Sequence, residues 1–142
     1  MAEVEDVLRR FAGQWTLSRR IEDARAGTTG RFEGTACLTP DGDGLRYDET
    51  GQLSLPGAAP MQASRSYLWR AADQRIAVLF EDGRPFHEFA VTADTARATH
   101  WCDPDDYRVS YSFETWPNWQ AEWQVSGPRK SYRMISSYCP AN

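Results

Sequence analysis

The feature that most constrains the fold of this chain is a two-residue hydrophobic period that begins near Gln14 and continues almost to the end. Turn-forming clusters interrupt it at short intervals: AGTTG, PDGDG, PGAAP, AADQ, EDGRP, TADTA, DPDD, TWPN and SGP. Because each turn is short, neighbouring strands should pair antiparallel, and so long a meander must curl or close to protect its edges. The pattern predicts a mainly β, antiparallel up-and-down β-barrel of about 8 to 10 strands.

One segment at the start has the period of a helix. Val4, Val7, Leu8 and Phe11 recur at helical spacing, which predicts one short N-terminal helix with a single apolar stripe. The chain has 142 residues and shows no internal repeat or linker, so we expect a single domain over residues 1–142. An alternative fold, a cone-shaped α+β sheet wrapped around several helices, normally needs more than one helix.

Composition limits the partners. A net charge of −4 argues against nucleic acid and against an anionic membrane, and leaves a small neutral or locally anionic ligand. Acidic residues stand where a signal peptide carries Lys or Arg, and no 18 apolar residues stand together, so we expect a cytoplasmic protein. Cys37, Cys102 and Cys139 include no C-x-x-C pair and are expected to be reduced thiols.

The first hairpin whose register can be predicted turns at Pro56-Gly57. Its opposed pairs are Leu53 with Met61, Gly51 with Ala63, Glu49 with Arg65, Tyr47 with Tyr67, and Leu45 with Trp69. This face is apolar except for the Glu49–Arg65 pair.

A second hairpin is expected around Asp103-Pro104. It opposes Cys102 with Tyr107, His100 with Val109, Ala98 with Tyr111, and Ala96 with Phe113. The next strand then places Trp119, Ala121, Trp123 and Val125 beside Phe113, Tyr111, Val109 and Tyr107. This continuous aromatic wall should face inward.

Four polar residues fall on otherwise apolar faces: Arg19, Glu49, Arg65 and His100. A buried charge is costly unless it is paired or used, so these residues are the best pointers to a site. Glu49 and Arg65 suit either a structural ion pair or the orientation of a ligand. Arg19 has no predicted neighbour, which suits an anionic ligand, unless the strand twists and Arg19 reaches solvent.

The two histidines have competing interpretations. His100 and Cys102 form H-x-C, with His87 as a conceivable third ligand, but no fourth ligand stands at a recognisable spacing. We therefore expect no metal, and a core histidine beside a buried thiol. His100 is otherwise a ligand contact or a general base, and His87 lies either in an exposed loop or at the barrel mouth. An EF-hand is rejected because Leu45 and Gln52 stand where calcium ligands are needed.

The segment that leads from the helix into Gly13-Gln14-Trp15 resembles the G-x-W signature of calycins, the superfamily of lipocalins, fatty-acid-binding proteins, nitrobindins and phycobilin lyases. The resemblance implies that Trp15 closes one end of the barrel and that an arginine of the last strand, Arg133 or else Arg129, packs across it. A nitrobindin would supply a haem-binding histidine. The chain lacks an extended match to that family, so no cofactor is assigned.

Five strings resemble a bacterial family of domains of unknown function: RRIEDARAGTTGRFEGTA, LFEDGRPFHEF, HWCDPDDYRVSY, WPNW and SGPRKSY. They cover nearly the whole chain. This resemblance implies no activity and no catalytic residues.

Three hypotheses about function follow. The first is a barrel that binds a small apolar or amphipathic molecule, with an anionic group as one option, through Arg19, Glu49, Arg65, Tyr67, His87, His100, Tyr111 and Trp123. The second is a cofactor-free isomerase, lyase or hydrolase in which His100 or Glu49 moves a proton with arginine support. The third is a structural or partner-binding barrel that uses its outer face or the WPNW loop. The sequence indicates no oligomeric state.

Overall fold

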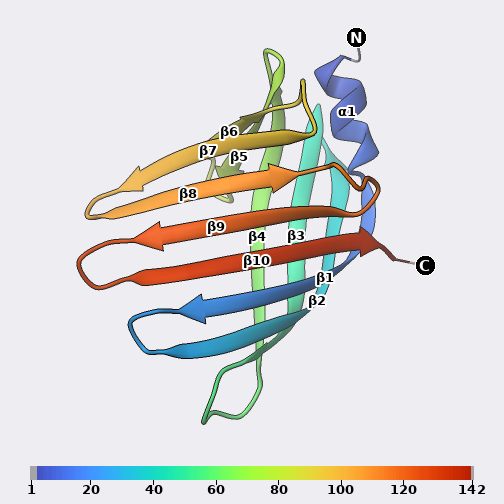
Figure 1. Cartoon of the computed structure of the whole chain (residues 1–142). Coiled ribbons are helices and arrows are strands. Elements are labelled where there is room, and N and C mark those ends of the chain that lie inside the picture. The colour runs from blue at the N-terminus through green and yellow to red at the C-terminus, as the bar shows by residue number, and fades with distance from the viewer. Residues whose placement is uncertain (1–2, 142) are drawn as a thin grey trace.

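In the computed structural model, which describes residues 3–141, ten antiparallel strands form one sheet beside one helix (Figure 1). The elements are α1 (Val4–Arg10), β1 (Gly13–Asp23), β2 (Thr28–Asp41), β3 (Gly44–Ser54), β4 (Met61–Ala72), β5 (Arg75–Phe80), β6 (Pro85–Ala90), β7 (Thr95–Cys102), β8 (Asp105–Ser112), β9 (Trp119–Ser126) and β10 (Ser131–Pro140). The predicted mainly β barrel with one short N-terminal helix is confirmed. The alternative of a sheet around several helices is wrong, because α1 is the single helix of the described residues.

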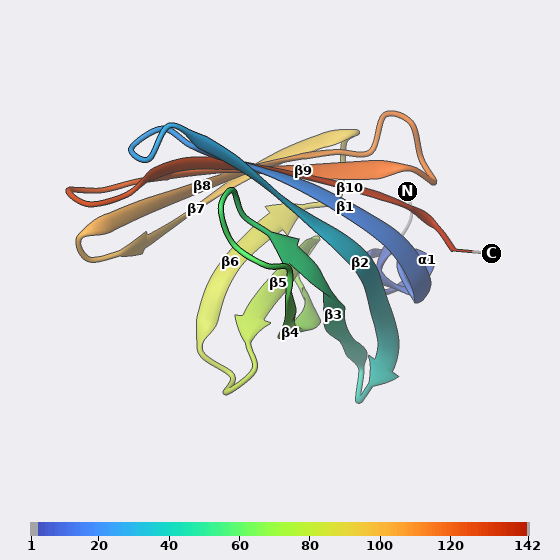
Figure 2. The ribbon, with the colours of Figure 1, turned by 90° about the horizontal axis from the view of Figure 1, so that it is seen from below.

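The sheet closes through its first and last strands. Strands that follow one another in sequence pair along the meander except β6 and β7, and β1 also pairs with β10, with Trp15 opposite Pro140 and Asp23 opposite Tyr132. The two free edges are therefore β6 and β7, which lie side by side without a hydrogen-bonded ladder. Figure 2 shows the resulting coil: β7 to β10 and β1 form one layer, and β3 to β6 turn beneath it. The barrel is nearly closed, with one seam.

Side chains bridge this seam. The ring of Phe89 on β6 stacks on Tyr111 of β8 at a centroid distance of 4.3 Å, and His87 Nε2 lies 2.8 Å from the Tyr111 hydroxyl. β7 lies between β6 and β8 across the seam, and it presents the small side chains of Ala96 and Ala98 on its inward face. These alanines leave room for the rings of β6 to reach β8.

An aromatic cluster fills the barrel end nearest α1. Gly13 adopts a φ of +128°, a conformation that favours glycine, just before Trp15, and the Trp15 indole N–H donates to the Phe11 carbonyl at 2.9 Å. The Phe11 ring lies 5.0 to 5.7 Å from four other rings, those of Trp69, Phe113, Trp116 and Trp119. Trp15 is 5% exposed and packs against Trp116 and Trp119 within this cluster.

The expectation that Arg133 packs across Trp15 is wrong. Arg133 stands opposite Glu22 in the β1–β10 ladder, far along the strand from the Trp15–Pro140 pair. Its guanidinium pairs with Glu122 at 2.8 Å and with Glu22 at 3.4 Å. A residue on the last strand meets Trp15 only if the register between the chain ends places it there, and no turn fixes that register.

The first predicted hairpin register is confirmed at all five pairs. The second is displaced by two residues: His100 opposes Tyr107, Ala98 opposes Val109, and Ala96 opposes Tyr111. The chain reverses over Asp103 and Pro104 alone, so the next two residues belong to β8. Because the displacement is even, each side chain keeps its predicted face, and the aromatic wall points inward.

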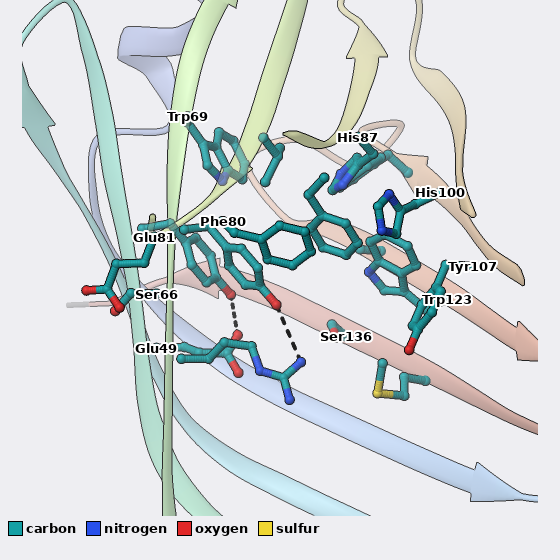
Figure 3. A pocket seen from close by; sticks show the side chains of 18 of the residues that line it. Glu49, Ser66, Trp69, Phe80, Glu81, His87, His100, Tyr107, Trp123 and Ser136 are labelled. Atoms are coloured by element: carbon teal, nitrogen blue, oxygen red, sulfur yellow. Dashed lines mark hydrogen bonds between the residues drawn. The ribbon is translucent and has the colours of Figure 1, made fainter. Parts of the chain in front are cut away.

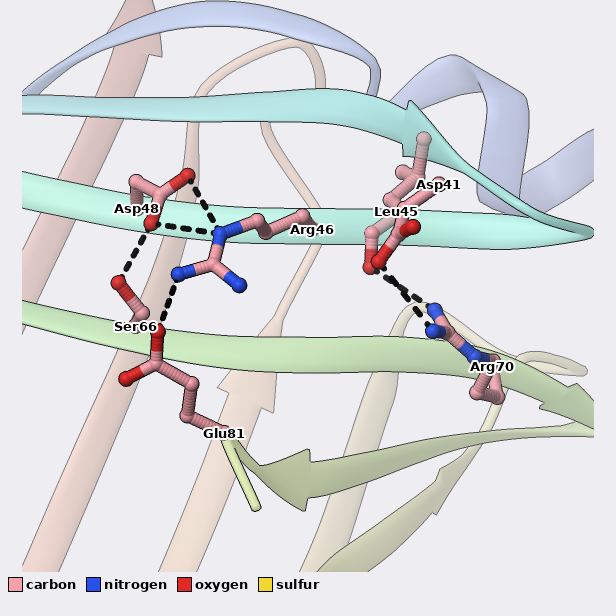
Figure 4. A network of polar contacts seen from close by, with 7 residues as sticks. All are labelled: Asp41, Leu45, Arg46, Asp48, Ser66, Arg70 and Glu81. Carbon is pink, nitrogen blue, oxygen red and sulfur yellow. Dashed lines mark hydrogen bonds and ion pairs between the residues drawn. The ribbon is translucent and has the colours of Figure 1, made fainter. Parts of the chain in front are cut away.

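A surface network of charges covers the outer face of β3 and β4, together with Asp41 at the end of β2 and Glu81 just after β5 (Figure 4). Arg46 bridges Asp48 and Glu81, Ser66 donates to Asp48, and Arg70 reaches Asp41 and the Leu45 carbonyl. Solvent-accessible pairs of this kind contribute little to stability. The network does, however, hold Glu81, at the edge of the barrel, in an ion pair with Arg46.

The three cysteines are free thiols, as expected. Cys102 and Cys139 are exposed and Cys37 is half-buried, so the expectation of a buried thiol beside His100 is wrong. No helix within residues 3–141 has the length and apolar character needed to cross a bilayer.

The substitution Tyr111→Phe tests the hydrogen bond across the seam. Removing this buried hydroxyl leaves His87 Nε2 without a partner, and we expect a loss of about 1 kcal/mol in the free energy of unfolding, measured by urea titration. Tyr107→Phe is the matched control, because its hydroxyl accepts one long, exposed contact from Lys130. Equal stability of the two variants would show that the seam does not depend on this bond.

Candidate functional site

The barrel encloses a cavity of about 900 Å³. All eight residues proposed from the sequence as ligand contacts line it: Arg19, Glu49, Arg65, Tyr67, His87, His100, Tyr111 and Trp123. Asp82 in the turn between β5 and β6, and Cys102 at the end of β7, lie at its rim. The cavity therefore opens at the end of the barrel away from Trp15.

A buried ion pair dominates one side of the cavity. The Arg19 guanidinium donates from Nη1 to Glu49 Oε2 at 2.7 Å and from Nη2 to Glu49 Oε1 at 2.9 Å. Its Nε donates to Ser136 Oγ at 2.7 Å, and its plane lies 5.3 Å from the centre of the Phe32 ring. Arg19 thus points inward as predicted. The expectation that it lacks a neighbour is wrong.

Two tyrosines extend the ion pair. The Tyr47 hydroxyl donates to Glu49 Oε1 at 2.6 Å and lies 2.7 Å from the Tyr138 hydroxyl. Because the Tyr47 proton goes to the carboxylate, Tyr138 is the donor in the contact between the two hydroxyls. Burial raises the pKa of Tyr138 to about 12. Both phenols therefore stay protonated near neutral pH.

Arg19 also decides the charge state of Glu49. Burial by itself would raise the pKa of Glu49, but the hydrogen bonds and positive charge of Arg19 outweigh it and hold the pKa below the ordinary value. Glu49 is therefore an ionised and fully engaged carboxylate. The predicted Glu49–Arg65 pair is opposed in the β3–β4 ladder, but the charge partner of Glu49 is Arg19.

Aromatic rings form the other side. Phe86 stacks on Phe80 at a centroid distance of 4.6 Å, on Trp123 at 5.1 Å and on Tyr67 at 5.6 Å. Figure 3 shows Glu49 at one end of the cavity, with His100, Trp123 and Tyr107 at the other. The cavity is thus divided between a charged end and an aromatic end.

His87 is buried within the aromatic end, at 7% exposure, and does not lie in an exposed loop. Its Nε2 contacts the Tyr111 hydroxyl, and its Nδ1 has no partner among the described residues. Burial, and then the nearby His100, lower the pKa of His87 to about 3. His87 is therefore neutral at physiological pH. His100 is half-buried and packs edge-on against Phe80 and Phe86.

Ser136 and Tyr138 complete the charged end and were not among the site residues predicted from the sequence. Both stand on the inward face of the last strand, which alternates Tyr132, Met134, Ser136 and Tyr138. That period-two run was the available signal. Within residues 3–141, no group of three or more His, Cys, Asp or Glu side chains gathers as a metal site.

Glu49→Gln tests the buried ion pair. Removing one partner leaves the Arg19 charge buried without compensation, so we expect unfolding free energy to fall by about 3 kcal/mol or more. Asp48→Asn on the outer face of the same strand is the matched control, with an expected loss of about 1 kcal/mol or less, because its partner Arg46 is accessible. Similar losses in the two variants, measured by urea unfolding at pH 7, would contradict this interpretation.

Because His87 is buried in its neutral form, we expect the folded protein to lose stability in acid. The folded pKa lies near 3 and the unfolded pKa near 6.5, so the unfolded state takes up the proton first and stability falls as pH drops below about 6.5. Between pH 7.5 and pH 5.0 this one group should cost about 2 kcal/mol. The same urea series on His87→Gln should lack that component. An unchanged pH slope in the variant would show that His87 is not the group responsible.

Two comparisons bear on this architecture. The solved structure of the S-type phycobiliprotein lyase CPES from Guillardia theta superposes with a TM-score of 0.68 and 12% sequence identity, over 99% of this chain and 94% of that chain. At this identity the likeness shows the fold alone, and it confirms the calycin-like barrel. No curated protein matches the sequence.

A family match agrees with the second resemblance seen in the sequence. It runs over residues 11–140, from the end of α1 to the end of β10. The chain belongs to the family of unknown function DUF6314.

Proposed function

We propose that this chain is a binding protein whose barrel interior holds one small amphipathic molecule. The observation that carries the proposal is the cavity of about 900 Å³, which the side chains leave unfilled. Pockets for small ligands typically measure about 300 to 1,000 Å³ and are mostly apolar with a few placed polar groups. The division into an aromatic end and a charged end fits that description.

The eight lining residues that were predicted from the sequence as ligand contacts have distinct roles in this proposal. Tyr67, Tyr111 and Trp123, together with the two histidines, supply flat apolar surface for the body of the ligand. Arg19, Glu49 and Arg65 fix its polar end or hold the groups that do. A ligand placed in this way lies along the barrel with its polar group toward β1, β3 and β4.

The proposal extends to a single domain over residues 1–142, located in a bacterial cytoplasm, without a nucleic acid or membrane partner. The net charge of −4 supports the exclusion of polyanionic partners. The occurrence of the same fold in a phycobiliprotein lyase supports the use of such a barrel for a small-molecule partner.

The other two hypotheses have less support. Glu49 is a poor general base, because its oxygens accept three hydrogen bonds and its pKa is lowered. A barrel that binds a protein partner through its outer face would present one large exposed apolar patch. The exposed large apolar residues of the described chain instead fall on three separate hairpins: Leu55, Met61, Trp101 and Trp116.

A neutral aromatic dye, N-phenyl-1-naphthylamine, tests the proposal. Its fluorescence should rise on binding, with one dye per chain. Trp123→Ala should weaken binding by about tenfold, because it removes a ring from the cavity wall. Trp101→Ala is the matched control, since Trp101 is 62% exposed.

The untagged protein, purified from cells, gives an independent reading through its absorption spectrum and its native mass before and after denaturation. A released small molecule would support the proposal and identify the class of ligand. Absence of dye binding, or equal effects of the two tryptophan substitutions, would contradict interior binding.

A further inference from the structure

The charged residues that line the cavity do not all pair with one another. Six lining residues carry a charge: Arg19, Glu49, Arg65, Glu81, Asp82 and Arg84. Five of them are in ion pairs, Arg19 with Glu49, Arg84 with Asp82, and Glu81 with Arg46 on the outer face. Arg65 has no carboxylate within 4.0 Å among residues 3–141. Within the described chain, Arg65 is therefore the one charged lining residue that is in no ion pair.

The hydrogen-bonding groups left over at the charged end are donors, because the carboxylate acceptors of Glu49 are already used. The acceptor oxygens of Glu49 are taken by Arg19 and by Tyr47, and the Tyr138 proton goes to Tyr47. Among residues 3–141, both Glu49 oxygens therefore already have donors.

Two hydroxyls at the same end keep a free proton. Ser136 Oγ accepts from Arg19 Nε at 2.7 Å, and the Tyr67 hydroxyl accepts from Arg65 Nη1 at 3.4 Å. Within the described chain neither hydroxyl donates to a protein atom, and both residues line the cavity. A hydroxyl whose lone pair is held by an arginine offers its proton to a ligand. Together with the guanidinium of Arg65, these groups form a surface of donors.

We propose that the charged end of the cavity is a carboxylate subsite, in which Arg65, Ser136 and Tyr67 donate to the anionic group of an aromatic carboxylate. The inference rests on the proposed function and specifies its ligand class. Arg65 supplies the charge and a planar fork that matches a carboxylate. The Arg19–Glu49 pair is the support that directs the Ser136 hydroxyl toward the cavity. The aromatic body then lies against Phe86 and Trp123.

A matched probe series tests the subsite. The probes are 2-naphthylacetate, the neutral 2-naphthaleneethanol and the cationic 2-(2-naphthyl)ethylamine, titrated by calorimetry at pH 7. The carboxylate should bind about tenfold or more tighter than the alcohol, and the amine should bind weakest, because the subsite offers positive charge and donors.

Three variants test which residues cause the preference for the carboxylate probe. Arg65→Gln should remove most of the preference for the carboxylate and leave the affinity for the alcohol within about threefold. Ser136→Ala should remove a smaller part of it, about threefold to tenfold. Arg108→Gln is the matched control, because Arg108 points outward from β8, pairs with Asp106 and does not line the cavity. It should leave all three affinities unchanged.

The outcomes separate the two proposals. If the alcohol and the carboxylate bind the wild-type protein equally well, the carboxylate subsite is refuted while interior binding stands. If the amine binds tightest, the subsite is refuted in the same way. If no probe binds, the proposed function fails and the subsite with it. The wild-type series decides the question even if a cavity variant does not fold.

Discussion

The pairing of the first strand with the last is the contact on which the rest of the structure depends. Without the β1–β10 ladder, the chain would be two separate meanders, with both inner faces open to water. With it, the sheet coils until β6 and β7 meet, and the free edges lie side by side at the seam. The same ladder brings Ser136 of β10 to the guanidinium of Arg19 on β1. Closure of the barrel and assembly of its charged end are therefore one event.

The seam explains the unusual environment of His87. A strand at a free edge cannot be held by backbone hydrogen bonds on both sides, so β6 is held by rings that pack across the inward-facing alanines of β7. His87 takes part in this packing with one polar contact to Tyr111, and its second ring nitrogen has no partner within residues 3–141. Burying an imidazole in this way keeps it neutral and makes the fold sensitive to acid. The side of the cavity that gives apolar surface to a ligand is also the side that closes the barrel.

The charged end follows a different physical rule. Burying Arg19 and Glu49 costs desolvation free energy, which the bidentate geometry and the bonds to Tyr47 and Ser136 offset. Once those groups satisfy each other, the polarity that remains belongs to Arg65 and to two hydroxyl protons. A buried ion pair thus determines which ligands suit the cavity without having to contact them itself.

The sequence alone determined which face each strand residue occupies, because that depends only on short-range alternation. The two-residue period set which side chains face inward, and placing the chain reversal at Pro56-Gly57 gave the β3–β4 register pair by pair. All eight proposed site residues line the cavity for that reason. Even the two-residue displacement of the β7–β8 hairpin left their faces unchanged, because the period is two.

Tertiary structure alone decided which inward residues meet. Arg19 and Glu49 lie on strands separated by β2, and Ser136 is 117 residues from Arg19 in sequence. The contact of Arg19 with Glu49 depends on how tightly the sheet coils, and its contact with Ser136 depends on the β1–β10 register. Arg133 was misplaced because no turn sets that register. His87 was buried by a seam that no local pattern marks. Alternation specifies the direction of a side chain, whereas the partner across the barrel is set by curvature and closure, which are properties of the whole sheet.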